Sequence, residues 1–431
     1  MKRYILCVVV GFQFSTALAQ TTIPPAQSSL KIFVARPQIR LMAELKAAEA
    51  AAAPAFLAFS KSPTPDERRT IVRQYSRELQ HLGNIRTFTG DDQGAIAAFD
   101  ARYPSGRIEI SPANKEIIAA ASVEDAISAI VKMATNRQVV ILNESHHVPM
   151  HRAFALKLAK ELKKIGFTYL AVEALTPQVG LDPLAKGYVD LISGYYVREP
   201  VFAQFLRETK ASGWTLVPYE PEPPEGNLSR TEQILSREIG QAKNIVDRIF
   251  SKQPDAKVFI YVGYGHAVKV PLPWPGEGPL EMMAAQLKKL TKIDPLTIDQ
   301  SVMFERNVPL PGNAVFQEAV SKFAPSGPVV IRKKDGSPVL DYSTGGYDLQ
   351  VLHPPSKRVG ERAGWLGTLA NRTPVDIPVS LLSDKSRRLI YAFYEADGPT
   401  AAPADVVLVT PGTPVPKFML PPGKFRYEYE E

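Results

Sequence analysis

Short apolar runs alternate with helix-forming segments from about residue 113 to residue 300. The run over 138–143 is apolar between its two end residues, which is typical of a strand buried on both faces of a sheet. Further runs of this texture lie at 167–174, 213–222, 256–266 and 295–301. Because strands that alternate with helices form parallel sheets, the pattern predicts an α/β fold with a mostly parallel sheet flanked by helices.

The segments between these runs carry helix start and stop signals. The segment 122–136 is amphipathic, with Ser122 as its predicted cap. Three more helices are predicted, over 149–166, 229–251 and 279–291. These three connect successive predicted strands, as a parallel sheet requires.

The first residues have the layout of a secretory signal peptide. Lys2 and Arg3 precede an apolar stretch well short of the roughly 20 residues of a membrane span, and Ala19 ends a small-residue cleavage motif. We therefore expect residues 1–19 to be removed, leaving a periplasmic or secreted chain without a transmembrane segment. The single cysteine, Cys7, lies in this signal, so the mature chain can have no cysteine nucleophile or thiolate metal site.

The segments on either side of the alternating region differ from it in texture. Residues 20–112 are mainly helical in pattern, with an Ala-rich helix broken at Pro54 and a second helix that stops at Gly83. Residues 357–431 contain short strand-like runs separated by Pro and Gly, which predicts a small C-terminal β module. The α/β domain is therefore expected over 113–356.

The charge pattern argues against a nucleic-acid partner. The formal net charge is +7 over 431 residues, and no dense Lys/Arg run is interleaved with aromatic residues. A small-molecule ligand or substrate is the expectation that remains.

The first four predicted strands each end in ionisable or coordinating side chains. Ligands of open parallel sheets bind at the carboxyl ends of the strands, and a carboxylate there is costly unless it is paired or hydrated. The sequence therefore predicts one site along one rim of the sheet. The structural alternative is that each Glu caps a helix or pairs with a surface base and that His266 is a turn residue. In chain order the strand-end residues are Glu144, His146 and His147, then Glu173, then Tyr219 and Glu220, then Gly263, Gly265 and His266.

These residue types restrict the chemistry. A covalent serine or cysteine mechanism is not expected, because the mature chain has no cysteine and no Gly-x-Ser-x-Gly motif before a helix. Carboxylates with imidazoles either bind a divalent metal ion or activate water directly, and both routes lead to hydrolysis. The predicted catalytic residues are Glu144, His146, His147, Glu173 and His266. The ligands of the metal-assisted version are Glu144, His146, Glu173 and His266.

Neighbouring side chains are predicted to contact the substrate. Tyr219, Glu220 and Tyr264 adjoin the strand-end acids and imidazoles in the sequence. Arg237, on the long polar helix, is predicted to hold an anionic group, with a structural ion pair as the equal alternative.

Three stretches together resemble a known superfamily. "ILNESHHVPMHRAFALKLAKELKKIGFTYLAVEA" (141–174) resembles the opening of the group that includes the ChaN-like haem-binding lipoproteins and the erythromycin esterases, with the Tiki/TraB proteins as more distant relatives. "SREIGQAKNI" (236–245) and "IYVGYGHAVK" (260–269) are similar to the segments that follow in those proteins. The resemblance covers residues 120–300 and does not extend to either flank.

The resemblance implies site residues and two functions. Glu144, Glu173 and His266 match the recurrent site residues, whereas His146 fits the ChaN-like spacing and His147 the esterase spacing. The chain departs from the pattern at one position, Asn143, where the family usually has Gly.

The first implied function is hydrolysis of an ester, lactone or amide, with or without a divalent metal ion. The second is haem or metal binding without catalysis, for which Tyr219, Tyr264 and the histidines offer ligands. Members of the superfamily include both kinds of protein, so the resemblance leaves the choice open.

Overall fold

The computed structural model describes residues 33–34, 39–103, 108–176, 182, 184–273, 278–306, 308, 310–340 and 345–431. Residues 32–431 form one compact unit. The predicted signal peptide, residues 1–19, lies outside the described residues. None of the helices in the described part is long and apolar enough to cross a bilayer.

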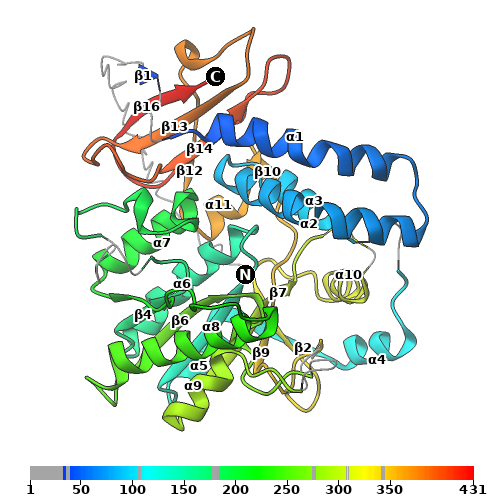
Figure 1. Ribbon diagram of the computed structural model, residues 1–431, viewed down its shortest axis with the longest axis vertical. Helices are drawn as coiled ribbons and strands as arrows, with labels where there is room; N and C mark the ends of the chain where they lie inside the picture. The colour runs from blue at the N-terminus through cyan, green and yellow to red at the C-terminus, as the bar shows by residue number, and fades with distance from the viewer. Residues whose placement is uncertain are drawn as a thin grey trace, which may run out of the picture. The chain divides into compact units, whose positions relative to one another are not determined.

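An eight-stranded sheet forms the centre of the chain (Figure 1). Its strands from β9 through β5 are parallel, and β8 and β2 extend the other edge in antiparallel pairing. The prediction of a mostly parallel sheet flanked by helices is therefore confirmed. In spatial order the strands are β2 (Ser122–Asp125), β8 (Val329–Arg332), β9 (Leu349–Leu352), β7 (Leu296–Met303), β3 (Val139–Glu144), β6 (Val258–Gly263), β4 (Tyr169–Val172) and β5 (Thr215–Pro218).

The strand order differs from the chain order at one functionally important place. Strand β6 inserts between β3 and β4, and its last residue, Gly263, lies in register with Glu144. The short helix η5 (Tyr264–Ala267) follows at once. Since all three strands are parallel, η5 lies between the carboxyl ends of β3 and β4.

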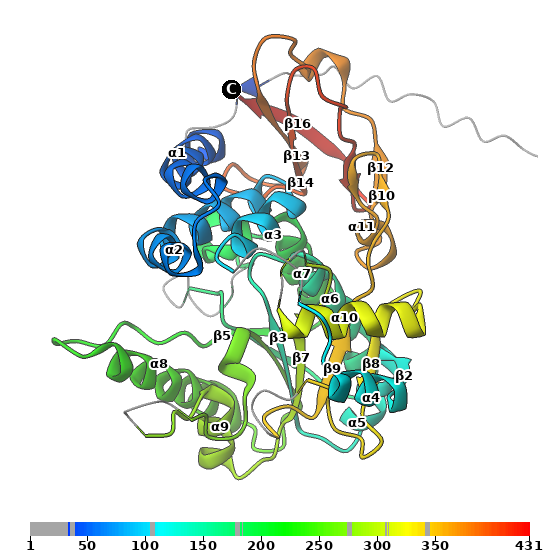
Figure 2. The same cartoon turned by 90° about the vertical axis from the view of Figure 1, so that its right-hand side faces the viewer.

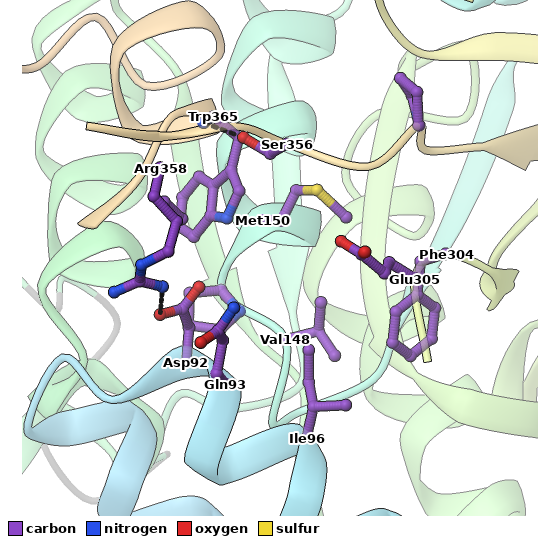
Figure 3. A pocket seen from close by; sticks show the side chains of 13 residues that line it. Asp92, Gln93, Ile96, Val148, Met150, Phe304, Glu305, Ser356, Arg358 and Trp365 are labelled. Carbon is purple, nitrogen blue, oxygen red and sulfur yellow. Dashed lines mark hydrogen bonds and ion pairs between the residues drawn. The ribbon is translucent and has the colours of Figure 1, made fainter. Parts of the chain in front are cut away.

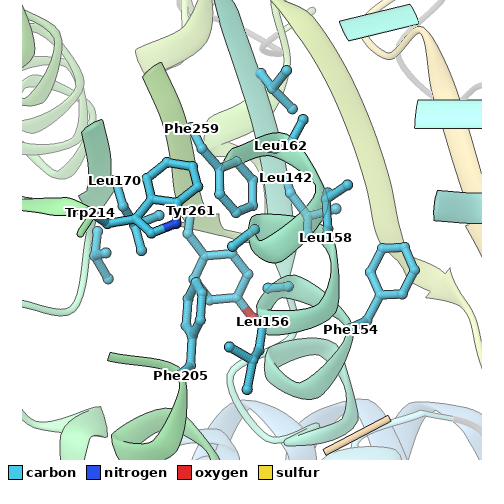
Figure 4. Close-up of a cluster of buried hydrophobic side chains, with 14 of the residues drawn as sticks. Leu142, Phe154, Leu156, Leu158, Leu162, Leu170, Phe205, Trp214, Phe259 and Tyr261 are labelled. Atoms are coloured by element: carbon cyan, nitrogen blue, oxygen red, sulfur yellow. The ribbon is translucent and has the colours of Figure 1, made fainter. Parts of the chain in front are cut away.

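Helices cover both faces of the sheet (Figure 2). Side chains that alternate along β3 enter different cores: Val140 and Leu142 pack with α5, α6 and α7, whereas Val139 and Ile141 pack with α8 and α9. Figure 4 shows the first of these cores, where Leu142 and Phe259 meet side chains of α6. The covering helices are α5 (Ala126–Ala134), α6 (Met150–Lys164), α7 (Pro200–Ala211), α8 (Arg230–Ile245) and α9 (Met283–Thr291), and α4 (Pro112–Ala120) and α10 (Pro311–Phe323) pack near β7 and β8.

The N-terminal helices and the C-terminal strands share a hydrophobic core. Leu45 and Leu82 of the helices are buried in the same cluster as Tyr391 and Phe393 of the C-terminal sheet. The prediction of an N-terminal helical region and of a small C-terminal β module is confirmed, although the two segments pack together. The elements involved are α1 (Leu41–Ser60), α2 (Pro65–Phe88), α3 (Asp92–Asp100) and a sheet of β1 (Phe33–Val34), β16 (Phe425–Glu430), β13 (Arg388–Tyr394) and β14 (Asp405–Val409).

Smaller elements complete the C-terminal module. They are β10 (Arg358–Val359), β11 (Arg362–Ala363), α11 (Trp365–Thr368), β12 (Thr373–Val375) and β15 (Phe418–Leu420). Strands β12 and β15 pair in antiparallel fashion, as do β10 and β11.

Three predicted boundaries are wrong. Ser122 begins strand β2 instead of capping a helix, and the cap of α5 is Asp125, which accepts from the backbone of Ser128. Helix α1 runs through Pro54 without a break. Helix α2 continues past Gly83, where a Cβ atom would lie 2.3 Å from the ring of Phe99. That glycine therefore allows close packing of α2 on α3 and does not end the helix.

We predict that Phe393→Ala lowers the free energy of unfolding by about 3–5 kcal/mol, because it leaves a cavity in the core shared by α1, α2 and β13. Urea unfolding followed by circular dichroism measures the change. The control is Val379→Ala, whose side chain is 82% exposed and which we expect to shift stability by less than about 0.5 kcal/mol. Equal effects of the two substitutions would contradict the shared core.

Candidate functional site

Polar side chains from neighbouring strand ends meet along the carboxyl edge of the sheet. Glu144 is the last residue of β3, Glu173 directly follows β4, and Glu220 follows β5. His266 lies in η5, directly after β6. Arg237 of α8 contacts Glu173, Glu220 and His266 at once. The structure thus brings these predicted site residues to one rim; their catalytic role stays a prediction.

A buried network of hydrogen bonds and an ion pair holds Glu144. Its carboxylate accepts from Arg152 Nε at 2.8 Å and Nη2 at 3.1 Å, and the Tyr261 hydroxyl donates to it at 2.7 Å. The His146 Nδ1 atom lies 2.6 Å from Oε1. Arg152 is itself completely buried and also reaches Glu199, 3.2 Å away. The Arg152 guanidinium thus lies between two carboxylates, whose negative charges compensate its positive charge.

The electrostatics of this network fix the protonation state of Glu144. Burial alone would raise the pKa of the carboxyl, but the charges of Arg152 and His146 hold it well below its usual range. Glu144 is therefore a permanent anion near neutral pH. As an anion it can orient His146 through Nδ1, and the expectation that Glu144 serves as base or metal ligand stays a prediction.

Glu173 is also held as an anion. It accepts from the backbone N–H of Gly263 and from Arg237. Burial raises the pKa of this carboxyl, but His266, His146 and Arg237 outweigh burial and lower the pKa to about 2. The carboxylate therefore lies between the two imidazoles as a fixed negative charge.

His266 is oriented by a carboxylate from α8. Its Nδ1 atom lies 2.8 Å from Oε2 of Glu238, which also accepts the backbone N–H of Met283. Its Nε2 atom faces Arg237 Nη1 at 2.9 Å and Glu173 Oε1 at 3.7 Å. Burial lowers the pKa of the imidazole, but Glu173 and Glu238 outweigh burial and raise it.

The contacts of His266 correspond to two protonation states. Nε2 can accept from Arg237 only when the ring is neutral, and once protonated it can donate to Glu173 instead. The ring therefore has a partner for Nε2 in both states, which is what a group that transfers protons requires.

Glu238 is the site residue that the sequence reasoning missed. It is completely buried, and with Gln241, Ala242 and Ile245 it forms the buried face of α8. Those positions follow the i, i+3, i+4, i+7 spacing of an apolar stripe. A carboxylate on that stripe was the available signal, because a buried charge requires a partner.

His146, which follows β3, lies beside the Glu173 carboxylate. A Cβ atom at Gly263 would lie 2.5 Å from His146 Nε2 and 3.0 Å from Glu173 Oε2, so the ring and the carboxylate both pack against this glycine. The His146 side chain is 15% exposed. It also stacks on Tyr196, with ring centroids 4.3 Å apart. The ring is thus held by Glu144, Gly263 and Tyr196, and a small part of it reaches solvent.

Asn143 positions the turn that follows β6. Its amide Nδ2 donates to the Tyr264 backbone carbonyl at 3.0 Å and to Asp299 at 2.9 Å. Tyr264 has a φ of 43°, a conformation that non-glycine residues adopt only when the surroundings impose it. Asn143 therefore supplies a bond that holds η5 in place, which a glycine could not do.

His147, the other predicted histidine of the loop, packs against aromatic side chains. His147 is buried and stacks on Phe99, with ring centroids 3.6 Å apart, and its Nδ1 atom lies 3.2 Å from the Tyr264 hydroxyl. Burial lowers its pKa, so the ring is neutral. His146, and not His147, therefore contacts the strand-end carboxylates.

The two predicted tyrosines differ in access to solvent. Tyr219 is completely buried, and its hydroxyl donates to the Tyr261 carbonyl at 3.3 Å. It cannot contact a ligand in this arrangement, so its predicted role in substrate binding is not supported. Tyr264 is 38% exposed and remains a candidate for substrate contact.

The rim does not fit a divalent metal ion. Arg152 occupies both oxygens of Glu144, and Arg237 together with the Gly263 amide occupies those of Glu173. Across the part of the chain that the structure describes, no three or more His, Cys, Asp or Glu side chains are arranged to hold a metal ion. A cation would have to displace both arginines.

Three of the haem ligands named above are engaged or inaccessible. The Tyr219 hydroxyl is buried, and that of Tyr264 is hydrogen-bonded to His147. His151 accepts the Ser145 N–H at 3.0 Å and is completely buried.

A separate small cavity lies at the other end of the histidine loop (Figure 3). Its volume is about 70 Å³, and it is enclosed mainly by apolar side chains, including Val148, Met150 and Trp365. None of the strand-end acids or imidazoles lines it. The cavity is therefore not part of the rim, although the loop between Glu144 and Met150 connects the two.

Comparison with known proteins assigns no family. No family model and no curated protein matches the chain. Distant structural similarity exists to bacterial toxin effector domains. The type III effector HopBA1 has 15% identity and a TM-score of 0.30 over 43% of this chain and 86% of that protein. RRSP, a MARTX toxin effector domain from Vibrio vulnificus, has 18% identity and a TM-score of 0.31 over 54% of this chain and 46% of that protein. Similarity at this level carries no argument about the chemistry of the rim.

We predict that Gly263→Ala displaces His146 from Glu173, because the added Cβ would overlap the imidazole ring. Diethyl pyrocarbonate should modify the His146 ring at least fivefold faster in the variant than in the wild type. Gly265→Ala is the matched control, since nothing lies within 4 Å of its Cβ position. Equal modification rates in both variants would contradict the packing described.

We also predict that the protein loses stability as pH falls below about 6.5. His353 is buried, donates from Nε2 to Gln300 at 2.9 Å, and has its pKa lowered to about 3 by burial. Because the unfolded chain binds a proton at about pH 6.5 and the folded chain does not, the contribution is complete above 6.5 and lost as pH falls toward 3. At pH 5 the loss is about 2 kcal/mol for this residue.

Urea unfolding of the wild type and of His353→Gln at pH 7 and pH 5 measures this effect. The variant keeps a hydrogen-bonding side chain but cannot titrate, so its stability should fall less between the two pH values. If the two proteins lose the same free energy, His353 does not carry the effect.

Proposed function

We propose that the strand-end rim is the active site of a hydrolase that activates water without a metal ion. One observation carries the proposal: two imidazoles, His146 and His266, each have Nδ1 held by a carboxylate, and both rings lie beside the same third carboxylate, Glu173. A carboxylate on Nδ1 leaves Nε2 as the atom that exchanges protons. Two such rings can supply the base and the acid of a hydrolytic reaction.

The two imidazoles are suited to different roles. His146, oriented by Glu144, is the proposed base that takes a proton from water. His266, whose pKa is raised, is the proposed acid that donates a proton to the leaving group. Glu173 keeps both rings in place and stabilises the protonated forms as protons move.

Arg237 is the proposed stabiliser of developing negative charge. Its side chain is 36% exposed, and it spans Glu173, Glu220 and His266. When water attacks a carbonyl carbon, the oxygen becomes an oxyanion, and a guanidinium already in position stabilises that charge without reorganisation. Glu220, which binds Arg237 and Gln241, fixes its orientation.

The sequence resemblance supports the same reaction class. Glu144, Glu173 and His266 match residues that recur in a superfamily with ester hydrolases among its members. An ester, lactone or amide is therefore the proposed substrate class. Location outside the cytoplasm stays a prediction from residues 1–19.

Not every strand-end residue is suited to a catalytic test. Glu144→Gln would leave the buried Arg152 without its main counter-charge, which costs about 3–5 kcal/mol and confuses loss of activity with loss of fold. Glu238→Gln is the better choice for the second dyad, since the amide can still occupy the space beside His266.

We predict that His146→Ala and Glu238→Gln each reduce kcat by at least 100-fold on the best substrate of a panel of p-nitrophenyl esters, lactones and amides. The reaction is expected to proceed in the presence of a chelator. His81→Ala serves as the control, because His81 is an exposed imidazole of α2 far along the chain from the rim. Unfolding midpoints of all three variants should be measured in parallel.

Activity that persists in both rim variants, or that a chelator abolishes in the wild type, would contradict the proposed mechanism. Loss of activity with an unchanged unfolding midpoint in the rim variants, and none in the control, would support it.

A further inference from the structure

Four arginines line a cavity beside the N-terminal helices. The cavity has a volume of about 420 Å³ and is lined by Arg68, Arg69, Arg73 and Arg102 with two prolines and Val72. No acidic side chain is among its lining residues. Its volume falls in the range of sites that hold small molecules, about 300–1,000 Å³. The cavity is separate from the strand-end rim and from the cavity in Figure 3.

One face of α2 supplies most of these charges. Arg68, Arg69, Val72 and Arg73 follow helical spacing and therefore lie on the same side of the helix. Like charges four residues apart, such as Arg69 and Arg73, destabilise an isolated helix by about 0.2–0.5 kcal/mol. Arg102, just beyond the end of α3, lines the same cavity, and α3 packs beside α2 (Figure 2). The fold thus places four positive charges close together, although their mutual repulsion disfavours the helix.

Intramolecular contacts orient these arginines without neutralising most of them. Arg68 donates from Nε and Nη2 to the carbonyls of Tyr103 and Ala101, and Arg102 donates from Nε to the Phe99 carbonyl. Carbonyl oxygens carry no net charge, so both guanidinium groups stay fully cationic. Arg73 makes no ion pair with any carboxylate in the described ranges, and Arg69 pairs with the exposed Asp66.

We propose that this cavity binds a soluble small molecule that carries two or more phosphate groups. Guanidinium groups match phosphate oxygens in bidentate geometry, and four of them can serve two phosphates. The proline and valine side chains provide apolar contact for the organic part of such a ligand. Binding would also remove the repulsion between Arg69 and Arg73.

The arginine cavity is connected to the rim through stacked rings. The Arg102 guanidinium lies 4.7 Å from the ring centroid of Phe99, which stacks on His147. His147 in turn contacts the Tyr264 hydroxyl at the rim. Binding in the cavity does not depend on hydrolysis at the rim, so the two proposals can fail separately.

Isothermal titration of the full chain with sodium tripolyphosphate at low salt tests the proposal. We expect binding that weakens as salt is raised, and at least a tenfold loss of affinity in Arg69→Ala/Arg73→Ala. The matched control is Arg77→Ala, which lies one turn further along α2 and outside the cavity lining, and we expect less than a twofold change. All substituted side chains are exposed, so each variant should unfold at the wild-type midpoint.

Two results would overturn the proposal. The first is failure of tripolyphosphate to bind, including the case in which vesicles of anionic phospholipid bind instead, since the arginines would then serve a lipid surface. The second is an equal loss of affinity in Arg77→Ala and in the double variant, which would show attraction to the general charge of α2 and not to the cavity.

Discussion

The buried ion pair between Glu144 and Arg152 is the interaction on which the site depends. Two charges without solvent are tolerated only when each is fully compensated, and here Glu199, Tyr261 and the backbone of His146 complete the set. The network joins the end of β3 to α6 and α7. It makes Glu144 a fixed anion, so the neighbouring imidazole is the group left to exchange protons. Glu144, one of the predicted catalytic residues, therefore holds Arg152, His146 and Tyr261 in position at the site.

The order of the strands places the second half of the site. Because β6 inserts between β3 and β4, His266 lies beside Glu173. Gly263 makes this possible, since any larger residue would occupy the space in which the imidazole and the carboxylate meet. Helix α8 then covers the rim and contributes Arg237 and Glu238 from adjacent positions. The site is thus shared by the ends of four parallel strands and by one helix.

The flanking segments extend the molecule beyond an α/β domain. The N-terminal helices share a core with C-terminal strands, and Phe99 of α3 packs directly on His147. Elements outside the resemblance therefore support the loop that carries the candidate base. The same helices line the arginine cavity, from which Arg102, Phe99 and His147 lead by successive contacts to Tyr264. Any coupling between the two would pass through Phe99 and Tyr264.

The sequence by itself determined the fold class and which strand ends carry the polar residues of the rim. Continuous apolar runs separated by amphipathic helices require a covered parallel sheet, and such a sheet gathers its strand-end residues on one edge. Only the tertiary structure decided which of those residues work together. His147 and Tyr219 are buried. Arg152 and the other partners of Glu144 keep its carboxyl ionised. The position of α8 places Glu238 beside His266. These outcomes depend on contacts between residues far apart in the chain, which local periodicity does not encode.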